Sequence, residues 1–235
     1  AALAHEKRMQ EAYRKGEDIH ILTAATVTGK DITEVTSEDR QRAKAVNFGF
    51  LYGMGAKNFV TYAFDEYDLT FSQEEAEQVR NRFFSLYNGL TIWHYEIEDF
   101  VRRHGYVVSP LGRIRRLPDV HSPDRYLQYE AVRQAINSPV QATASDFTLT
   151  AMVILHNLFK ESARLDAQVI GQVHDSIMVE CDEETADEVA RRIKEVMETE
   201  VPDYVAKRFG YHFPLPLSAE VHIGQKWGRP EVVLD

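Results

Sequence analysis

Cysteine and long apolar runs are scarce in this sequence, and both absences limit what the protein can be. The single cysteine among 235 residues, Cys181, excludes an internal disulfide and a cysteine-cluster metal site. No stretch approaches 18 consecutive apolar residues, no basic-then-apolar leader is present, and no N-x-S/T sequon occurs. These absences predict no membrane contact and an intracellular location, by default cytoplasmic; a nucleoid, an infected cell or an organelle matrix also fits.

The chain carries more acidic than basic side chains, with a formal net charge of -10. This sum argues against a generic nucleic-acid binder, because phosphate neutralisation demands a basic surface. Basic residues nevertheless cluster within 40–44 and again within 113–116, so local binding of an anion remains open. A composition with 44% hydrophobic and 27% charged residues predicts one large globular domain or two small ones.

Residue spacing predicts a mainly helical chain with a few strands, which is an α+β fold. Thr36 and Ser37, followed by acids, predict the start of a helix over 37–51. A strand at 106–108 leads into a basic turn at 110–116, and the apolar run at 168–180 predicts two strands meeting at 174–176. The remaining expected elements are a helical stretch at 6–25, two helices within 72–104 divided near 88–89, a helical stretch at 126–160 that Pro139 restarts or kinks, a helix at 184–209 and a strand-like tail at 217–223.

One face of the helix at 37–51 carries two cations followed by two aromatic rings. Arg40, Lys44, Phe48 and Tyr52 are each four residues apart, so they form a single stripe along the helix. Like charges at this spacing repel, and a triphosphate followed by a sugar and base matches cations followed by rings. From spacing alone, a solvated basic face on a helix packed by its aromatics is the preferred interpretation.

The pattern R-x-x-x-K-x-x-x-F-G-x-x-Y-G at 40–53 resembles the O-helix motif of family A DNA polymerases at every fixed position. The resemblance implies that Arg40 and Lys44 hold the triphosphate of an incoming dNTP, with Lys44 counted as catalytic. It also implies that Phe48 lies against the sugar and base, and that Tyr52 occupies the template-base position until the fingers close.

A second motif lies at the expected hairpin, where His174 and Asp175 precede Ser176. A carboxylate at a tight turn suits a metal ligand, but an aspartate in a turn is more often only turn chemistry. The segment resembles the palm motif usually written H-D-E. The resemblance implies that Asp175 is catalytic and binds Mg2+, and that His174 touches the primer end. Ser176 stands where the family usually has glutamate, so the role of that glutamate is open in this chain.

The third motif, at 133–146, resembles the family stretch R-x-x-x-N-x-P-x-Q-G-x-A-x-D. Arg133, Asn137 and Gln141 are four residues apart and are expected to present donors to the duplex near the active site, where minor-groove acceptors recur in every base pair. The alternative for Asn137 and Gln141 is capping around Pro139. For Asp146 a purely structural role is preferred.

Flanking matches extend the resemblance from about Leu3 to Trp227; they are G-E-D-I-H at 16–20, L-G-R at 111–113 continuing to Pro118, and E-V-H-I-G at 220–224 before Trp227. It implies helical fingers at 1–116 followed by the C-terminal part of a palm with an antiparallel sheet at 117–235. The implied activity is that of a DNA-directed DNA polymerase in replication or repair, using dNTP, primer-template DNA and two Mg2+ ions.

Family members carry a first catalytic aspartate just upstream of an L-A-H sequence, and this sequence starts with Ala1-Ala2-Leu3-Ala4-His5. Asp175 alone does not build a two-metal site. We therefore expect that a second polypeptide, or an N-terminal segment outside this sequence, supplies the other aspartate and the thumb. A non-catalytic nucleic-acid-binding subunit is the alternative, although Arg40, Lys44 and Phe48 favour the enzyme.

Overall fold

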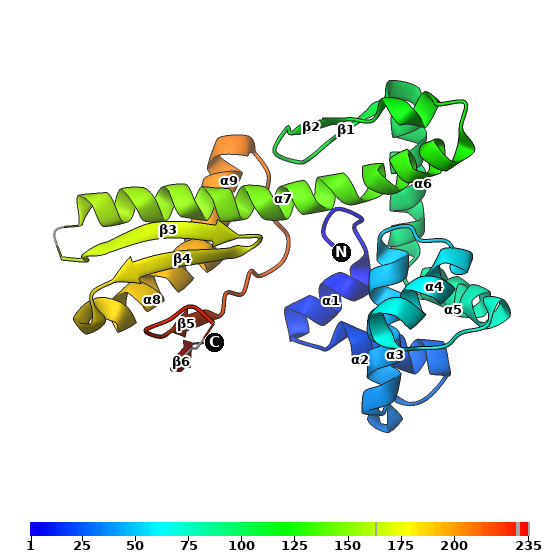
Figure 1. The fold of residues 1–235 in the computed structure, drawn as a ribbon, viewed down its shortest axis with the longest axis horizontal. Coiled ribbons are helices and arrows are strands. Elements are labelled where there is room, and N and C mark those ends of the chain that lie inside the picture. The colour runs from blue at the N-terminus through cyan, green and yellow to red at the C-terminus, as the bar shows by residue number, and fades with distance from the viewer. Residues whose placement is uncertain (163, 229–230, 235) are drawn as a thin grey trace. The chain divides into compact units, whose positions relative to one another are not determined.

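The computed structural model describes residues 1–162, 164–228 and 231–234, most of them helical. The described strands form two-stranded antiparallel sheets (Figure 1). The expected α+β class is thereby confirmed. The chain divides into two compact units, one comprising Ala1–Val108 with Ile114–Val140 and the other comprising Ser109–Arg113 with Gln141–Asp235.

The first unit is a helical body with one short hairpin. Its elements are α1 (Lys7–Lys15), α2 (Ile19–Thr28), a 3-10 turn (Ile32–Glu34), α3 (Ser37–Leu51), α4 (Ala56–Tyr67), α5 (Gln73–Leu86), α6 (Asn88–His104), β1 (Tyr106–Val108), β2 (Ile114–Arg116), a 3-10 turn (Pro118–His121) and the first part of α7 (Arg125–Glu161).

Capping side chains set the starts of two of these helices. The Thr36 hydroxyl accepts a hydrogen bond from the backbone N–H of Asp39, and the Asp39 carboxylate accepts one from the backbone N–H of Thr36. The helix α3 therefore begins where the sequence predicts. Ser72 and Glu75 form the same reciprocal pair at the start of α5. The expected division of 72–104 into two helices is confirmed, with the break at Tyr87.

The stretch expected to be helical at 6–25 forms two helices, because Gly16 adopts φ 67° and ends α1, after which Asp18 caps α2. One expectation for the first unit needs correction. The basic segment 110–116 is not wholly a turn. Its last three residues form β2, which pairs with β1 through the Tyr106 and Arg116 register. A strand whose side chains are all exposed has no apolar alternation to reveal it.

The core of the first unit is aromatic and lies behind α3. Phe50, Phe59 and Phe83 are fully buried there, with the rings of Phe50 and Phe59 4.5 Å apart. Gly49 permits this approach, since a Cβ at that position would lie 2.7 Å from Phe59 Cδ2. The glycine after Phe48 therefore lets α3 pack closely on α4 and fixes the direction in which the opposite face of α3 points.

The second unit combines long helices with the β3–β4 hairpin. Its described elements are the second part of α7, β3 (Ala167–Val173), β4 (Ser176–Cys181), a 3-10 turn (Glu183–Thr185), α8 (Ala186–Glu195), a π-helical turn (Val196–Glu200), α9 (Val201–Phe209), β5 (Val221–Ile223) and β6 (Val232–Leu234). The hairpin expected at 168–180 is confirmed, and Figure 1 shows it beside α7 and α8. Leu155 on α7 and Val205 on α9 are fully buried in the same core.

Three further corrections concern the second half of the chain. Residues 125–161 form one helix that continues through Pro139 rather than restarting there. The helix expected at 184–209 consists of α8, a π-helical turn and α9. Pro202 in the first turn of α9 has no N–H to donate, which fits the change of helical type just before it. The tail expected at 217–223 is a strand only at β5, which pairs with β6.

Hydropathy along the described helices leaves no candidate for a membrane span: none combines the necessary length with sufficient apolarity.

Candidate functional site

The predicted stripe on α3 exists as an exposed face. Arg40, Lys44 and Phe48 are exposed, Tyr52 is half-buried at the end of the helix, and the residues on the opposite face are buried. Phe48 leaves 40% of its surface exposed, which is unusual for a phenylalanine beside a well-packed aromatic core. The stripe therefore presents two cations and a ring to whatever binds this face.

Arg40 is already paired within the first unit. Its NH2 group lies 2.7 Å from Asp18 Oδ2, and its Nε donates to the same oxygen at 2.8 Å. The other carboxylate oxygen of Asp18 caps α2 by accepting from the backbone N–H groups of His20 and Ile21. Partial burial acts to raise the pKa of Asp18, but the Arg40 contact and these backbone hydrogen bonds outweigh it and hold the pKa below its usual value.

Lys44 differs from Arg40 because it has no ion pair among the described residues. An exposed ammonium with no anionic partner, beside a guanidinium that is only partly neutralised, leaves a local positive charge on a protein of net negative charge. This part of α3 is therefore a candidate surface for binding an anion.

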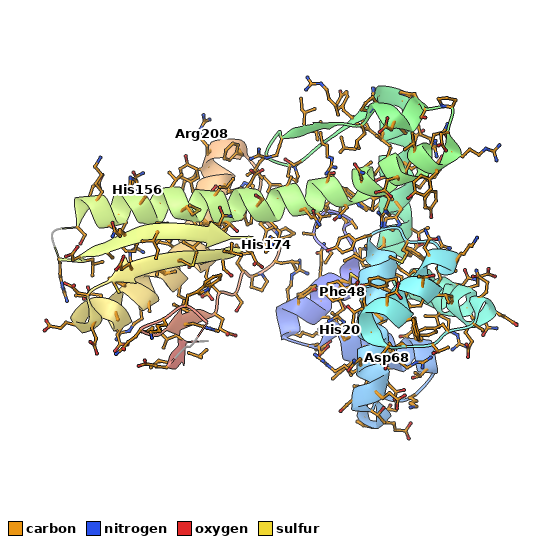
Figure 2. The ribbon with its side chains drawn as sticks, in the orientation of Figure 1. His20, Phe48, Asp68, His156, His174 and Arg208 are labelled. Atoms are coloured by element: carbon orange, nitrogen blue, oxygen red, sulfur yellow. The ribbon has the colours of Figure 1, made fainter. Side chains whose placement is uncertain are left out.

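His20 belongs to the same face, and residue spacing did not single it out. Its ring centroid lies 6.0 Å from that of Phe48 (Figure 2). Burial lowers the pKa of His20, Asp18 acts in the opposite direction, and the nearby charges of Arg40 and Lys44 lower the pKa further. The sequence signal for His20 is the segment G-E-D-I-H at 16–20, one of the flanking matches to the family, which by itself gives no role to the histidine.

The far end of α3 is held by contacts to other helices of the first unit. His94 Nε2 lies 3.0 Å from the backbone oxygen of Leu51, and Gly53 follows with φ 77°. A Cβ at Gly53 would lie 3.0 Å from Ile136 Cδ1. Tyr13 has its pKa raised by burial and by the nearby Tyr52. Tyr52 is thus set against several helices at the point where α3 stops.

In the second unit, His174 and Asp175 form the two-residue turn between β3 and β4. Val173 pairs with Ser176, and His174 sits at the tip with φ 54° (Figure 2). Left-handed backbone is uncommon for a residue with a side chain and is concentrated at turns and functional sites. Gln172 Nε2 donates to the backbone oxygen of His174 at 2.8 Å, which holds the turn. Asp175 is exposed, so its carboxylate is free to meet a ligand.

The duplex-facing residues expected on α7 lie along one helix but differ in environment. Arg133 is paired with Glu130 at 2.9 Å, while Gln141 is exposed. Asn137 Oδ1 is enclosed and accepts no hydrogen bond from the described residues. A buried acceptor normally receives a hydrogen bond, so the Asn137 amide is a candidate for a hydrogen bond with a bound ligand.

Asp146 has a partner inside the second unit. Its buried carboxylate accepts from Arg113, with Nε 3.2 Å from Oδ1 and a second, shorter contact through NH2. The hydrogen bonds and charge of Asp146 raise the pKa of Arg113. This ion pair fits the structural role favoured for Asp146.

No group of three His, Cys, Asp or Glu side chains suited to a metal ion occurs within residues 1–162, 164–228 and 231–234.

Comparison with known proteins identifies the family. The family model described as DNA polymerase family A matches residues 1–229, so the chain belongs to DNA polymerase family A. The chain is 35% identical over 227 residues to the thermostable DNA polymerase I of Thermus filiformis, covering 97% of this chain and 25% of that protein. It is 33% identical over 221 residues to DNA polymerase I of Aquifex aeolicus, covering 94% of this chain and 35% of that protein.

A solved structure agrees with the family assignment. The POL domain of Pol1 from M. smegmatis, in complex with DNA primer-template and dNTP, matches with a TM-score of 0.79 and 30% identity. The match covers 93% of this chain and 35% of that one. The chain is thus part of a family A polymerase domain and spans about a quarter to a third of the length of these relatives.

Proposed function

We propose that the α3 stripe binds the triphosphate and sugar of an incoming dNTP. The observation that carries the proposal is that Arg40, Lys44 and Phe48 are all exposed on one face of α3. Lys44 has no ion pair among the described residues. Lys44 neutralises the phosphates and stabilises the charge that develops during transfer, which is its catalytic role. Phe48 packs on the sugar and base, and Tyr52 holds the template-base position until the fingers close.

The same proposal assigns primer-template DNA to residues outside α3. Arg133, Asn137 and Gln141 contact the duplex, and His174 contacts the primer end. The relative solved with primer-template and dNTP supports this choice of ligands by similarity. We keep the division into fingers at 1–116 and palm at 117–235 as part of the proposal.

Mg2+ fits this chain only in part. When bound, the two Mg2+ ions would activate the primer hydroxyl and stabilise the charge on the leaving group. Asp175 offers one carboxylate, and the described residues supply no cluster of three ligands. The remaining carboxylate therefore comes from outside the described residues, on an upstream segment or a partner chain. With that carboxylate, the activity is DNA-directed DNA synthesis, a template-directed nucleotidyl transfer.

Direct titration of the chain with dNTP tests the proposal without requiring turnover. Lys44→Ala removes one charge-assisted contact, worth about 1.5 to 3 kcal/mol, and is expected to weaken dNTP binding roughly ten- to a hundredfold. Lys57→Ala is the matched control, because Lys57 is an exposed cation on the neighbouring helix α4. Equal affinities for the two variants would refute the assignment of α3.

A non-catalytic nucleic-acid-binding role is the second candidate. Ser176 in place of the usual glutamate favours it, since one carboxylate of the palm motif is missing. This role predicts that the chain binds primer-template DNA but shows no affinity for dNTP that depends on Lys44. The titration above, repeated with primer-template in place of dNTP, distinguishes the two functions.

A further inference from the structure

A buried chain of hydrogen bonds runs through the first unit behind the α3 stripe. Tyr87, at the junction of α5 and α6, places its hydroxyl 2.8 Å from Thr23 Oγ1 on α2. Thr23 Oγ1 donates to Asn47 Oδ1 on α3 at 3.0 Å, and Asn47 Nδ2 lies 2.8 Å from His20 Nδ1. Thr23 and Tyr87 are 0% exposed and Asn47 is 7% exposed, so water does not replace these contacts.

The order of donors in this chain determines where the imidazole of His20 carries its proton. Because Asn47 Oδ1 accepts from Thr23, the amide turns its Nδ2 donor toward His20 Nδ1. With Asn47 Nδ2 facing it, Nδ1 offers a lone pair, and this orientation of the amide favours the neutral ring with its proton on Nε2. Thr23 Oγ1 also donates to the backbone oxygen of Ile19 at 2.8 Å, so its single hydroxyl proton is shared between that oxygen and Asn47 Oδ1.

The surroundings of His20 favour the neutral ring. Burial and the charges of Arg40 and Lys44 lower its pKa, against the opposing effect of Asp18. Asn47 directly precedes Phe48 in α3, and the ring of Phe48 stands 6.0 Å from that of His20. His20 Nε2 has no hydrogen bond to the described residues, so it is the ring nitrogen left for a ligand on the stripe.

We propose that Asn47, supported by Thr23 and Tyr87, is a positioning residue that holds His20 as an Nε2–H donor beside Lys44 and Phe48. The ligand of that donor, a phosphate oxygen of the dNTP, rests on the proposed function of the stripe. The positioning itself does not, because the hydrogen-bonded chain is complete without a nucleotide. The hydrogen-bonded chain also connects α2 to α3, and this connection holds the His20 imidazole in place beside the cations of α3.

The isosteric variant Asn47→Asp tests this role, because it replaces the amide donor facing Nδ1 by a carboxylate acceptor. A carboxylate there draws a proton onto Nδ1 and raises the pKa of His20. Nitrogen NMR of the 15N-histidine-labelled chain, without nucleotide, reports the protonation of each ring nitrogen. The His20→Gln variant identifies the His20 signals among the nine histidines.

In the unsubstituted chain we expect the neutral tautomer with the proton on Nε2. In Asn47→Asp we expect Nδ1 protonated and the titration midpoint of His20 higher by about one pH unit or more. Asn58→Asp is the matched control, since it makes the same change on an exposed position of α4. Identical His20 signals in Asn47→Asp and Asn58→Asp, or an Nδ1–H tautomer in the unsubstituted chain, would overturn the proposal.

Thr23→Val keeps the test decisive if Asn47→Asp does not fold, as judged by circular dichroism and thermal unfolding. This variant leaves the Asn47 amide in place but removes the donor to its Oδ1, so the amide can turn over. We expect His20 then to populate both neutral tautomers; an unchanged Nε2–H tautomer would count against positioning by Asn47.

A final titration of the unsubstituted chain with dNTP separates the two proposals. Movement of the His20 Nε2 signal supports both. An Asn47-dependent tautomer with no response of His20 to dNTP, together with equal affinities of Lys44→Ala and Lys57→Ala, would reject the nucleotide site and leave the positioning role intact.

Discussion

Asp18 opposes the charge of Arg40 at the edge of the stripe, so Asp18→Asn is expected to strengthen dNTP binding. The carboxylate contacts the Arg40 guanidinium through one oxygen and caps α2 through the other. Asparagine retains an oxygen acceptor and is as good an N-cap as aspartate, so α2 keeps its start. The substitution therefore removes a negative charge from the site with little change in structure.

The size of this gain follows from the exposure of the pair. The side chains of Arg40 and Asp18 are 45% and 30% exposed, and ion pairs this exposed contribute about 0.2 to 1 kcal/mol. Freeing Arg40 from Asp18 to contact a phosphate is expected to improve the binding free energy by a similar amount, which corresponds to roughly 1.4- to 5-fold tighter dNTP binding. Because solvent-exposed charges are screened by salt, the gain is expected to shrink at high ionic strength. Arg40→Ala has the opposite effect, since it removes a cation and leaves the Asp18 carboxylate beside the phosphates.

Titration with dNTP at low and at high salt measures this gain. The matched control is Asp65→Asn, which makes the same charge change at an exposed position of α4. A pH near neutrality suits the assay, because the lowered pKa of Asp18 keeps its carboxylate ionised there. Equal or weaker binding by Asp18→Asn than by Asp65→Asn at low salt, with both variants folded, would refute the role of this face in holding phosphate.

Three further predictions test other parts of the molecule. Asp175→Asn, in an assembly that supplies the rest of the polymerase, is expected to abolish single-turnover synthesis while retaining DNA binding; a loss under about tenfold, or roughly 1.4 kcal/mol, would make Asp175 a turn residue only. Gly89→Ala is expected to cost about 2 to 4 kcal/mol of unfolding free energy in a denaturant titration, because overpacking adds to a lost charge-assisted hydrogen bond. The new Cβ would lie 2.8 Å from Glu6 Oε2, which now accepts from the Gly89 N–H at 2.6 Å, and unchanged stability would contradict this account. Hydrogen bonds from Lys30 and Thr36 lower the pKa of Asp39 from 3.8 to about 2. A lowered carboxyl pKa stabilises the fold above the unfolded value, so thermal stability should fall between about pH 4 and pH 2, and less so in Asp39→Asn.

Local signals in the sequence were sufficient for the elements whose causes are local. Thr36 and its acidic neighbours determined the start of α3, and four-residue spacing placed Arg40, Lys44 and Phe48 on one exposed face. The apolar run around the His174 turn determined the β3–β4 hairpin. Each of these features depends on residues within a few positions of one another, so spacing alone predicts it.

Other features depend on partners distant in the sequence, and only the tertiary structure decided them. Strand β2 exists because β1 pairs with it, and its exposed side chains leave no periodic pattern. The partner of Asp146 is Arg113, 33 residues away, and the hydroxyl that supports Thr23 comes from Tyr87, 64 residues away. A buried polar group must find a hydrogen bond, but which residue supplies it depends on how the helices pack. The sequence alone therefore determined which side chains of α3 form the stripe. Packing decided that His20 lies beside them and that Asn47 contacts the His20 ring.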